Sequence, residues 1–360
     1  MRNRILFIIG LLCLPLTAAS AADPPYPHSA AIVNLTWDAG VVRIGEGDDG
    51  KNGVGDNWPI TWGDDGNLYT SYGDGPGFYI RPRDFLTLGF AKIMGTPPDI
   101  TAKDIPSDAD AIVNWGNKGI KSSGLLMVDH ILYMFIRNYL VNGEYRHSRL
   151  ASSKNHQENW TWADWYFSDT FGCPEFVQFG PNYAGARDNY VYIVSQDNDD
   201  AYGYSPDVVM TRVPKDKVGD RNAYRYFSGL DAKGRPGWSV DIAERKPIFT
   251  DPRGTQRISL TYNRAIRRHI LTSSHRVGTD THNGSLGVFD APEPWGPWTT
   301  VYYDDRWSGA NRTYHHKFPT KWMSADGRTM WLLYSGLGGN NYAVIVKRAT
   351  LELATGTTRK

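Results

Sequence analysis

Two acidic residues stand directly before short apolar segments of similar composition. Asp56 comes shortly before Trp58-Pro-Ile-Thr-Trp62, and Glu175 immediately precedes Phe176-Val-Gln-Phe179. Two carboxyl groups that face one pocket can hydrolyse a glycosidic bond, because one protonates the leaving oxygen while the other activates water or attacks the sugar carbon. We therefore predict Glu175 as the acid and Asp56 as the base or nucleophile, provided that the fold brings them together.

Cations and imidazoles precede three further apolar segments. They could donate hydrogen bonds to sugar hydroxyls and keep one carboxylate ionised. They could also neutralise a uronate carboxylate while His315, His316 or Tyr262 removes the C5 proton, which is the chemistry of a polysaccharide lyase. We expect the following residues to bind substrate: Asn57, Trp58, Lys121, Arg257, Tyr262, His315, His316 and Lys317.

One pattern of an apolar strand, a polar turn and an aromatic-rich second strand recurs along the chain. In its first copy Trp58–Trp62 is followed by a Gly-Asp-Asp-Gly turn and by Leu68–Tyr72. The predicted first strands begin at Trp58, Gly124, Phe176, Ile258 and Pro319. Each interval leaves room for four short strands, and a four-stranded sheet repeated around an axis is a propeller blade. We predict an all-β fold, a single five-bladed β-propeller with four-stranded antiparallel blades. Two tandem sandwiches are the competing architecture.

The innermost strand of each propeller blade begins near the central axis, so the side chains just before those strands should converge there. The predicted ring consists of Asp56, Lys121, Glu175, Arg257 and Lys317, with His315 and His316 close by. Two segments read as insertions between blades. Pro97–Asn117 is polar and is expected to be a loop or a short helix, and Pro214–Trp238 is expected to be a charged surface excursion.

Composition agrees with a β-rich globular protein. The 360 residues are 41% hydrophobic and 13% aromatic and include 37 glycines, which favours short strands joined by tight turns over a helical bundle or a doubly wound fold. The formal net charge is +1, whereas phosphate binding needs an excess of basic surface. We therefore expect no nucleic-acid partner, and a monomer that acts on an oligo- or polysaccharide.

The N-terminal residues have the pattern of a targeting signal. Arg2 and Arg4 precede the apolar run Ile5–Leu16, and Ala19 and Ala21 form an A-x-A end. Such a run is too short to span a bilayer and is typical of a secretory signal peptide. We predict that residues 1–21 are cleaved, that residues 22–360 form the propeller domain, and that the protein is secreted or periplasmic without stable membrane insertion. Its remaining cysteine, Cys173, is expected to be a buried thiol.

Metal and cofactor signals are weak. The segment Gln196-Asp-Asn-Asp-Asp200 is rich in oxygen ligands and could hold a structural Ca2+, but it lacks the spacing of a dedicated calcium loop. The sequence contains no H-E-x-x-H motif and no P-loop. We expect no cofactor and no catalytic metal.

Several motifs are similar to those of a known family. The segment Asp56–Gly75, the segment Arg212–Lys217 with its continuation Ala223–Phe227, and the Pro-Trp-Gly-Pro-Trp run within Asp290–Trp298 resemble a secreted bacterial family called domain of unknown function 4185. The last run also resembles five-bladed arabinanase-like hydrolases, and Ser153–Trp162 looks like a degenerate sialidase Asp-box, which is a structural turn. Some members of the family are endo-acting D-arabinanases, so the resemblance implies glycoside hydrolysis by propeller carboxylates. Among the candidates, only Asp56 maps onto such a position.

These patterns favour a secreted glycoside hydrolase that degrades a plant or microbial polysaccharide. A non-catalytic glycan-binding propeller and a lyase acting on uronate-containing glycans stay open as alternatives.

Overall fold

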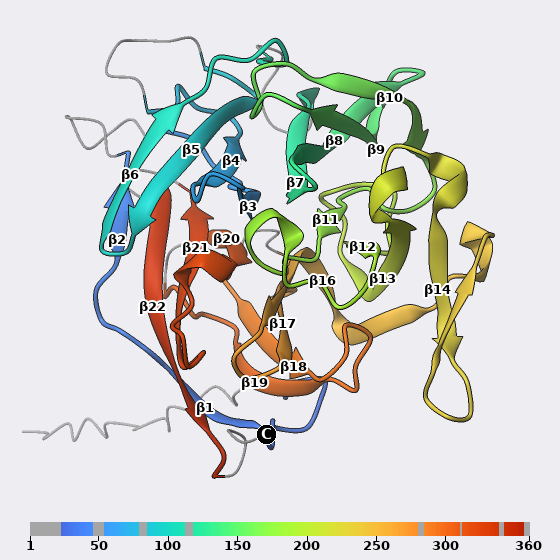
Figure 1. Ribbon diagram of the computed structural model, residues 1–360. Helices are drawn as coiled ribbons and strands as arrows, with labels where there is room; N and C mark the ends of the chain where they lie inside the picture. Colours follow the sequence, from blue (N-terminus) through green and yellow to red (C-terminus); the bar gives the residue numbers. More distant parts are fainter. Residues whose placement is uncertain are drawn as a thin grey trace, which may run out of the picture.

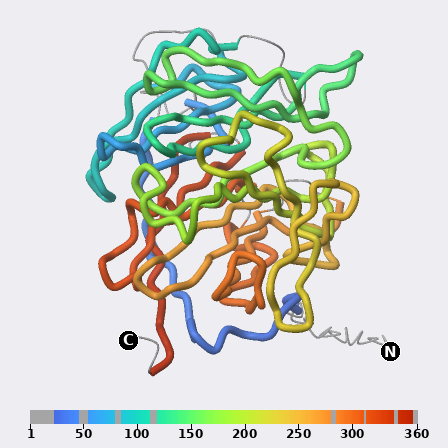
Figure 2. Tube along the Cα trace, turned by 45° about the vertical axis from the view of Figure 1, so that its right-hand side comes forward, coloured from blue at the N-terminus to red at the C-terminus, as the bar shows by residue number. Residues whose placement is uncertain are grey.

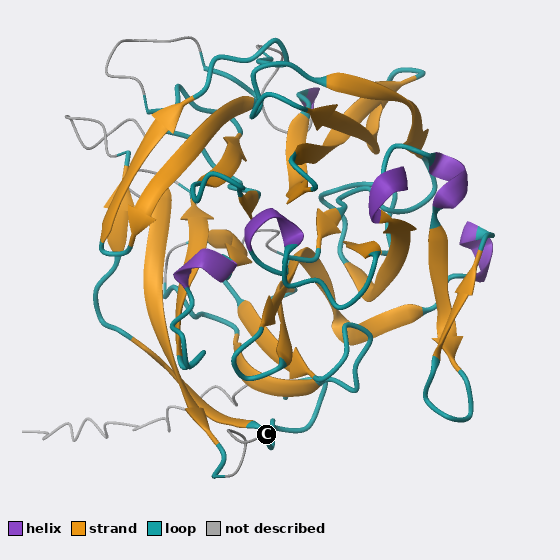
Figure 3. Cartoon of the chain, viewed as in Figure 1, coloured by secondary structure: helices purple, strands orange, loops and turns teal. Residues whose placement is uncertain are grey.

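The computed structural model describes residues 23–45, 54–78, 85–111, 118–279, 284–309, 312–337 and 342–355. Antiparallel β-strands make up the regular structure of these ranges, together with single 3-10 turns (Figure 3), which confirms the all-β class. The turns are η2 (Pro181–Tyr183), η3 (Lys215–Lys217), η4 (Arg221–Ala223), η5 (Ile242–Glu244) and η6 (Thr320–Trp322). Within the described ranges no helix is long and apolar enough to cross a membrane. The predicted signal peptide, residues 1–21, lies outside them.

Two sheets follow the predicted strand pairs in chain order (Figure 1). The first consists of β3 (Ile60–Trp62), β4 (Leu68–Tyr72), β5 (Gly89–Thr96) and β6 (Asp99–Asp104). The second consists of β7 (Lys121–Val128), β8 (Ile131–Val141), β9 (Glu144–Ser153) and β10 (Thr161–Phe167). Every residue of β4 and β7 is buried, because neighbouring sheets cover both faces of these strands. The Asp-box-like segment forms the turn between β9 and β10.

A long strand joins the next two groups of strands into one sheet. The sheet runs through β11 (Glu175–Phe176), β12 (Tyr190–Gln196), β13 (Ser205–Pro214), β16 (Pro247–Asn263), β17 (Arg268–His275), β18 (Leu286–Ala291) and β19 (Thr299–Asp304). The first part of β16 pairs with β13, and its last part pairs with β17. One strand therefore forms the outer edge of the third group and the inner strand of the fourth.

The last sheet brings the two ends of the described chain together. It consists of β20 (Thr313–Lys317), β21 (Thr329–Gly336), β22 (Val344–Leu353) and β1 (Ile32–Trp37), and β2 (Val42–Ile44) also pairs with β22. Ile32 lies opposite Leu353, and β1 runs beside β22 in Figures 1 and 2. The first strand thus completes a sheet whose other main members come from the C-terminal part of the chain.

The five groups of strands pack in a cycle around a common centre (Figure 1). Their inner strands touch in order, since β7 contacts β3 and β11, and β16 contacts β11 and β20. Four hydrophobic clusters fill the wedges between neighbouring groups. One cluster, which contains Leu88 and Leu125, joins the first group to the second. Another, which contains Trp58 and Leu333, joins the fifth group to the first. The remaining two connect the second group to the fifth by way of the third and fourth.

Two local predictions need correction, and the structure adds detail to a third. The fifth inner strand is β20, whereas Pro319–Met323 contains the turn η6; Pro319 has no N–H to donate to a ladder. In the predicted loop Pro97–Asn117, Pro97 and Pro98 form a hairpin turn and β6 follows, while residues 112–117 lie outside the described ranges. The charged excursion Pro214–Trp238 contains η3, η4 and a hairpin of β14 (Arg225–Leu230) with β15 (Pro236–Ser239).

Candidate active site

The five charged residues of the predicted ring all lie in the interior, each at most 6% exposed. Each comes from a different group of strands: Asp56, Lys121, Glu175, Arg257 and Lys317. Burial of so many charges is costly unless each group finds a partner, so their contacts indicate how the cluster is organised. We call these five residues, together with the side chains that contact them, the axial cluster.

Bulges in three inner strands aim side chains at the axial cluster. The strand register shifts between Ser122 and Gly124 in β7, around Arg257 in β16, and around His315 in β20. Arg257 and His315 have φ angles of 56° and 57°, a left-handed conformation that non-glycine residues adopt at a cost. A bulge turns a side chain away from the regular alternation. The residues predicted to precede their strands therefore lie within them, in β7 and β20 as well as in β16.

Several side chains hydrogen-bond to Asp56, among them Tyr342. The Tyr314 hydroxyl donates to Oδ2 at 2.6 Å, and the Asn57 side-chain amide donates to Oδ1 at 2.7 Å. Burial, followed by the negative charge of Asp74, raises the pKa of Asp56, although Tyr314, Lys121 and Arg137 act in the opposite direction. The protonated form of Asp56 is therefore favoured relative to an exposed aspartate.

Asp74 is a second carboxylate at this position that the sequence reasoning missed. The backbones of Asp56 and Gly73 exchange hydrogen bonds of 2.9 and 3.0 Å, which brings the next residue, Asp74, beside Asp56. Asp74 forms an ion pair with Lys121, whose side chain is almost fully buried. The signal was present in the predicted hairpin. Trp62 pairs with Leu68, and extending this register away from the turn places Asp56 opposite the Tyr-Gly-Asp-Gly segment.

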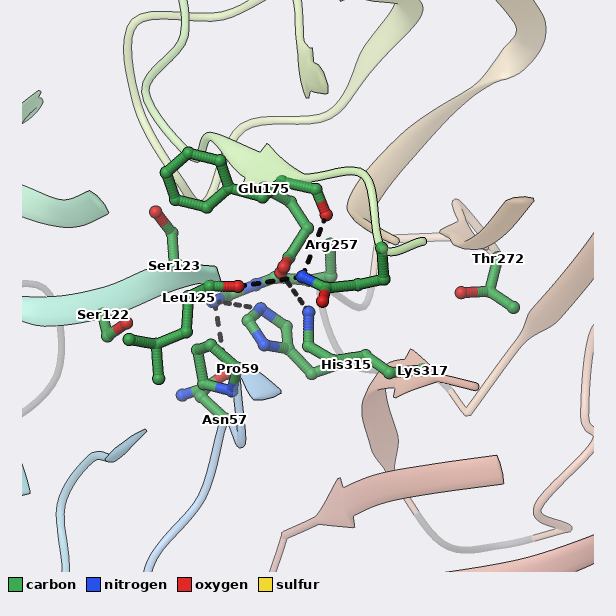
Figure 4. Close-up of polar contacts among 12 residues, drawn as sticks. Asn57, Pro59, Ser122, Ser123, Leu125, Glu175, Arg257, Thr272, His315 and Lys317 are labelled. Carbon is green, nitrogen blue, oxygen red and sulfur yellow. Dashed lines mark hydrogen bonds and ion pairs between the residues drawn. The ribbon is translucent and has the colours of Figure 1, made fainter. Parts of the chain in front are cut away.

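Arg257 connects several strands at the centre (Figure 4). Its Nη1 donates to Asn57 Oδ1 at 3.3 Å and to His315 Nε2 at 3.0 Å. Burial and the cations around it, Arg257 first among them, hold the pKa of His315 well below its usual value. The imidazole is therefore neutral and accepts the hydrogen bond from Arg257.

Glu175 pairs with Lys317, and Figure 4 shows their side chains meeting beside Arg257. Burial raises the pKa of Glu175 to about 7, even though the Lys317 ammonium acts to lower it. Asp56 and Glu175 share no hydrogen-bond partner among the described residues. Asp56 is linked to the Glu175 side of the cluster through Asn57 and Arg257 and also through Tyr314, which belongs to the strand that carries His315 and Lys317.

Three predicted substrate-binding residues lie elsewhere. Trp58 is a core residue whose indole donates to the Ala343 carbonyl and packs on Tyr72. His316 is buried against Trp307 and Tyr334, on the opposite side of the strand from His315. Tyr262 lies five residues beyond Arg257 on β16, roughly 16 Å along the strand. Order in the sequence does not give these positions, because they depend on core packing for Trp58 and His316 and on the length of β16 for Tyr262.

Arg137 in β8 also belongs to the axial cluster and was not predicted. It is fully buried, its Nη1 donates to the Ser122 carbonyl at 3.2 Å, and its charge acts on Asp56 and Arg257. An arginine within the apolar run Leu132–Leu140 is the signal that could have identified it, since arginine is rarely buried without a specific role.

The oxygen-rich segment Gln196–Asp200 is engaged by protein donors. Asp197 accepts hydrogen bonds from Thr170 and Arg245, and Asp199 pairs with Arg146. Among the described residues no group of three or more His, Cys, Asp or Glu side chains has an arrangement that could hold a metal ion. Cys173 is buried, as predicted.

The chain was compared with protein families and with curated proteins. A family model described as domain of unknown function (DUF4185) matches residues 117–337. No curated protein matches the chain.

Among solved structures, a Bacteroides ovatus protein provisionally described as a hydrolase aligns with a TM-score of 0.51 and 12% identity, over 83% of this chain and 86% of that one. An α-L-arabinofuranosidase from Podospora anserina, solved with cellotriose, aligns with a TM-score of 0.48 and 10% identity over 90% and 98% of the two chains. A GH43_1 enzyme from Xanthomonas citri, solved with xylotriose, aligns with a TM-score of 0.48 and 12% identity over 85% and 89%. The first of these alignments supports the all-β architecture.

Proposed function

The chain belongs to the family of domain of unknown function 4185, and we propose that this member is a glycoside hydrolase whose reacting carboxylates are Asp56 and Asp74. The observation that carries the proposal is the placement of two carboxylates side by side in different environments. Asp56 is buried and hydrogen-bonded, whereas Asp74 pairs with a cation. Glycoside hydrolysis uses two such carboxyl groups, one protonated and one ionised.

The environments assign the roles. Asp56 has a raised pKa, so it is the better proton donor to the leaving oxygen. The Lys121 ammonium stabilises the negative charge of Asp74, which suits a base or a nucleophile. This assignment replaces the base or nucleophile role predicted for Asp56. Glu175, the acid predicted from sequence, is the competing partner for Asp56, with a pKa of about 7 that would leave much of it protonated at neutral pH.

None of the three bases predicted for the lyase alternative suits that role. His315 contacts Arg257, but its depressed pKa makes it a weak base. The pKa of His316 is lowered to about 3 by burial, and Tyr262 lies at the other end of its strand. These observations favour hydrolysis over β-elimination.

We further propose that the five groups of strands are the blades of one five-bladed propeller. The sequential contacts of the inner strands, the hydrophobic cluster that joins the fifth group to the first, and the completion of the last sheet by β1 support this architecture. We propose a secreted or periplasmic monomer that acts on an oligo- or polysaccharide.

The test measures reducing ends released from a panel of polysaccharides by the full mature chain. On the substrate that is cleaved, Asp56→Asn and Asp74→Asn should each lower the rate by ~10²-fold or more, since each removes a proton-transfer group. Asp99→Asn, on the exposed hairpin of β5 and β6, is the matched control and should keep full activity. Thermal unfolding of each variant shows whether it is folded.

The outcomes separate the alternatives. If Glu175→Gln abolishes activity while Asp74→Asn retains it, Glu175 is the partner of Asp56 and the proposed pair is wrong. Products that absorb in the ultraviolet through an unsaturated uronate would identify a lyase. Binding of a glycan without turnover by the wild-type protein would identify a binding module.

A further inference from the structure

A groove lies at the end of the inner strands opposite the axial cluster, where the turns to the second strands gather. It consists of two adjoining hollows of about 510 and 610 Å³ that share the side chains of Phe179, Tyr262 and Arg264. The turns η2 and η6, which help to line it, lie near the centre of the molecule in Figure 3. Each hollow is within the usual size range of small-ligand sites. We call it the turn-side groove.

Aromatic side chains form much of its surface. Tyr262 is half-buried, and its ring packs on Phe179 at 5.6 Å and on His269 at 4.7 Å, so the ring is fixed in place. Trp62, also half-buried, lines the first hollow. A rigid aromatic ring with an open face can stack on the C–H surface of a sugar ring at little entropic cost, as aromatic side chains do in many recognition sites.

The charges of the groove are positive and partly unpaired. Arg264 and Arg267 are exposed in the turn between β16 and β17, and neither forms an ion pair with a described residue. Arg187 and Glu293, which line the second hollow, pair with each other. Burial lowers the pKa of His269 to about 3, so this imidazole is neutral and adds no charge. The two free guanidinium groups are therefore available for a carboxylate, which arginine binds in a bidentate manner.

We propose that the turn-side groove is a second carbohydrate-binding site, which holds a uronate-containing stretch of a polysaccharide. Sugar rings stack on Tyr262 and Trp62, and uronate carboxylates bind Arg264 and Arg267. The site is remote from the axial cluster, because Tyr262 and Arg257 are separated by roughly 16 Å along β16. Its occupation would keep the protein on an acidic polymer and raise the effective concentration of that polymer at the other end. The inference concerns binding alone and does not require that the axial cluster be hydrolytic.

The experiment measures by calorimetry the binding of an oligogalacturonate and of its carboxyl-reduced counterpart to the mature chain. Wild-type protein should bind the acidic oligomer about tenfold or more tightly than the reduced one, since charge-assisted hydrogen bonds to arginine are lost on reduction. The double variant Arg264→Ala/Arg267→Ala should lose a similar factor for the acidic oligomer and little for the reduced one. Tyr262→Ala should weaken the binding of both.

Two controls keep the result specific. The double variant Lys233→Ala/Arg235→Ala removes the same charge from the exposed hairpin of β14 and β15 and should bind like wild type. Asp99→Asn, an exposed acid on the hairpin of β5 and β6 outside both sites, should also leave this binding unchanged. Equal affinity of the wild type for the two oligomers, or wild-type binding by Arg264→Ala/Arg267→Ala, would overturn the proposal. Equally tight binding of poly-glutamate would assign the groove to an acidic polypeptide and overturn it as well.

Discussion

Charged side chains are buried at one end of the inner strands and exposed at the other. At the axial cluster Lys121 pairs with Asp74, and Lys317 pairs with Glu175, with three of the four side chains almost fully buried. At the turn-side groove Arg264 and Arg267 are exposed and have no ion-pair partner among the described residues. A third buried cation at the axial cluster, Arg257, donates hydrogen bonds to Asn57 and His315 rather than to a carboxylate. An exposed guanidinium, by contrast, stays hydrated until a ligand replaces the water.

The two ends also differ in where residues with a left-handed backbone conformation lie. At the axial end left-handed residues, Arg257 and His315, occur inside strands and are maintained by the surrounding sheets. At the groove end the left-handed Arg267 is in a turn, where such conformations are common. The fold therefore buries charged side chains at one end, where ion pairs and hydrogen bonds hold them, and presents exposed cations at the other.

The largest expected effect comes from breaking a buried pair. At a pH above about 7, where Glu175 is ionised, Lys317→Met leaves its carboxylate buried without a cation and should lower the free energy of unfolding by about 3–5 kcal/mol, as seen when one partner of a buried pair is removed. The double variant Lys317→Met/Glu175→Leu removes both charges and should recover much of this loss. Urea denaturation measures both. A single variant as stable as the double one would show that the pair carries no buried charge.

Sequence reasoning was most successful where local pattern and topology agree. Four of the five predicted strand pairs are observed, because an apolar strand, a polar turn and a second apolar strand specify a hairpin locally. The ring residues reached the centre because they flank or belong to inner strands. The fifth inner strand was missed, since the sequence His315-His316-Lys317 resembles a polar loop and its burial depends on neighbouring sheets.

The candidate site was harder to predict because its pairings are set by long-range packing. Asp74 follows β4, so its contact with Lys121 depends on how the first sheet packs on the second. Arg137 is enclosed by an otherwise apolar strand, and its role depends on Asp56 and Arg257 from other sheets. Tyr262 was assigned to the wrong end because β16 continues well beyond the centre. Composition and motif spacing contain none of this geometry.

Glu175 in the axial cluster and His269 beside the groove should contribute to stability with opposite dependence on pH. Burial raises the pKa of Glu175 from 4.5 to about 7, so its contribution to stability is present at low pH and lost as the pH rises through this window. Burial lowers the pKa of His269, beside the groove, from 6.5 to about 3, so its contribution is present above pH 6.5 and lost as the pH falls.

The measurement compares the free energy of unfolding of wild type with that of Glu175→Gln and His269→Gln between about pH 5 and pH 7. Relative to Glu175→Gln, wild type should lose up to about 1.4 kcal/mol per pH unit as the pH rises; relative to His269→Gln, it should lose a similar amount as the pH falls. Differences that are flat in pH would contradict the environments inferred for these two groups.

The smallest expected effect on stability is at the rim of the turn-side groove. Arg187 and Glu293 form an ion pair with side chains 31% and 44% exposed, and such pairs contribute less than about 1 kcal/mol. Glu293→Gln should therefore change the free energy of unfolding far less than Lys317→Met does. Because it removes the negative charge of Glu293 from the groove and leaves Arg187 with Asp188 as its remaining acidic partner, it should also strengthen oligogalacturonate binding by about twofold or more, an increase that high salt abolishes. A large loss of stability, or weaker binding, would show that Glu293 supports the fold as the buried acids do and would remove the contrast between the two ends.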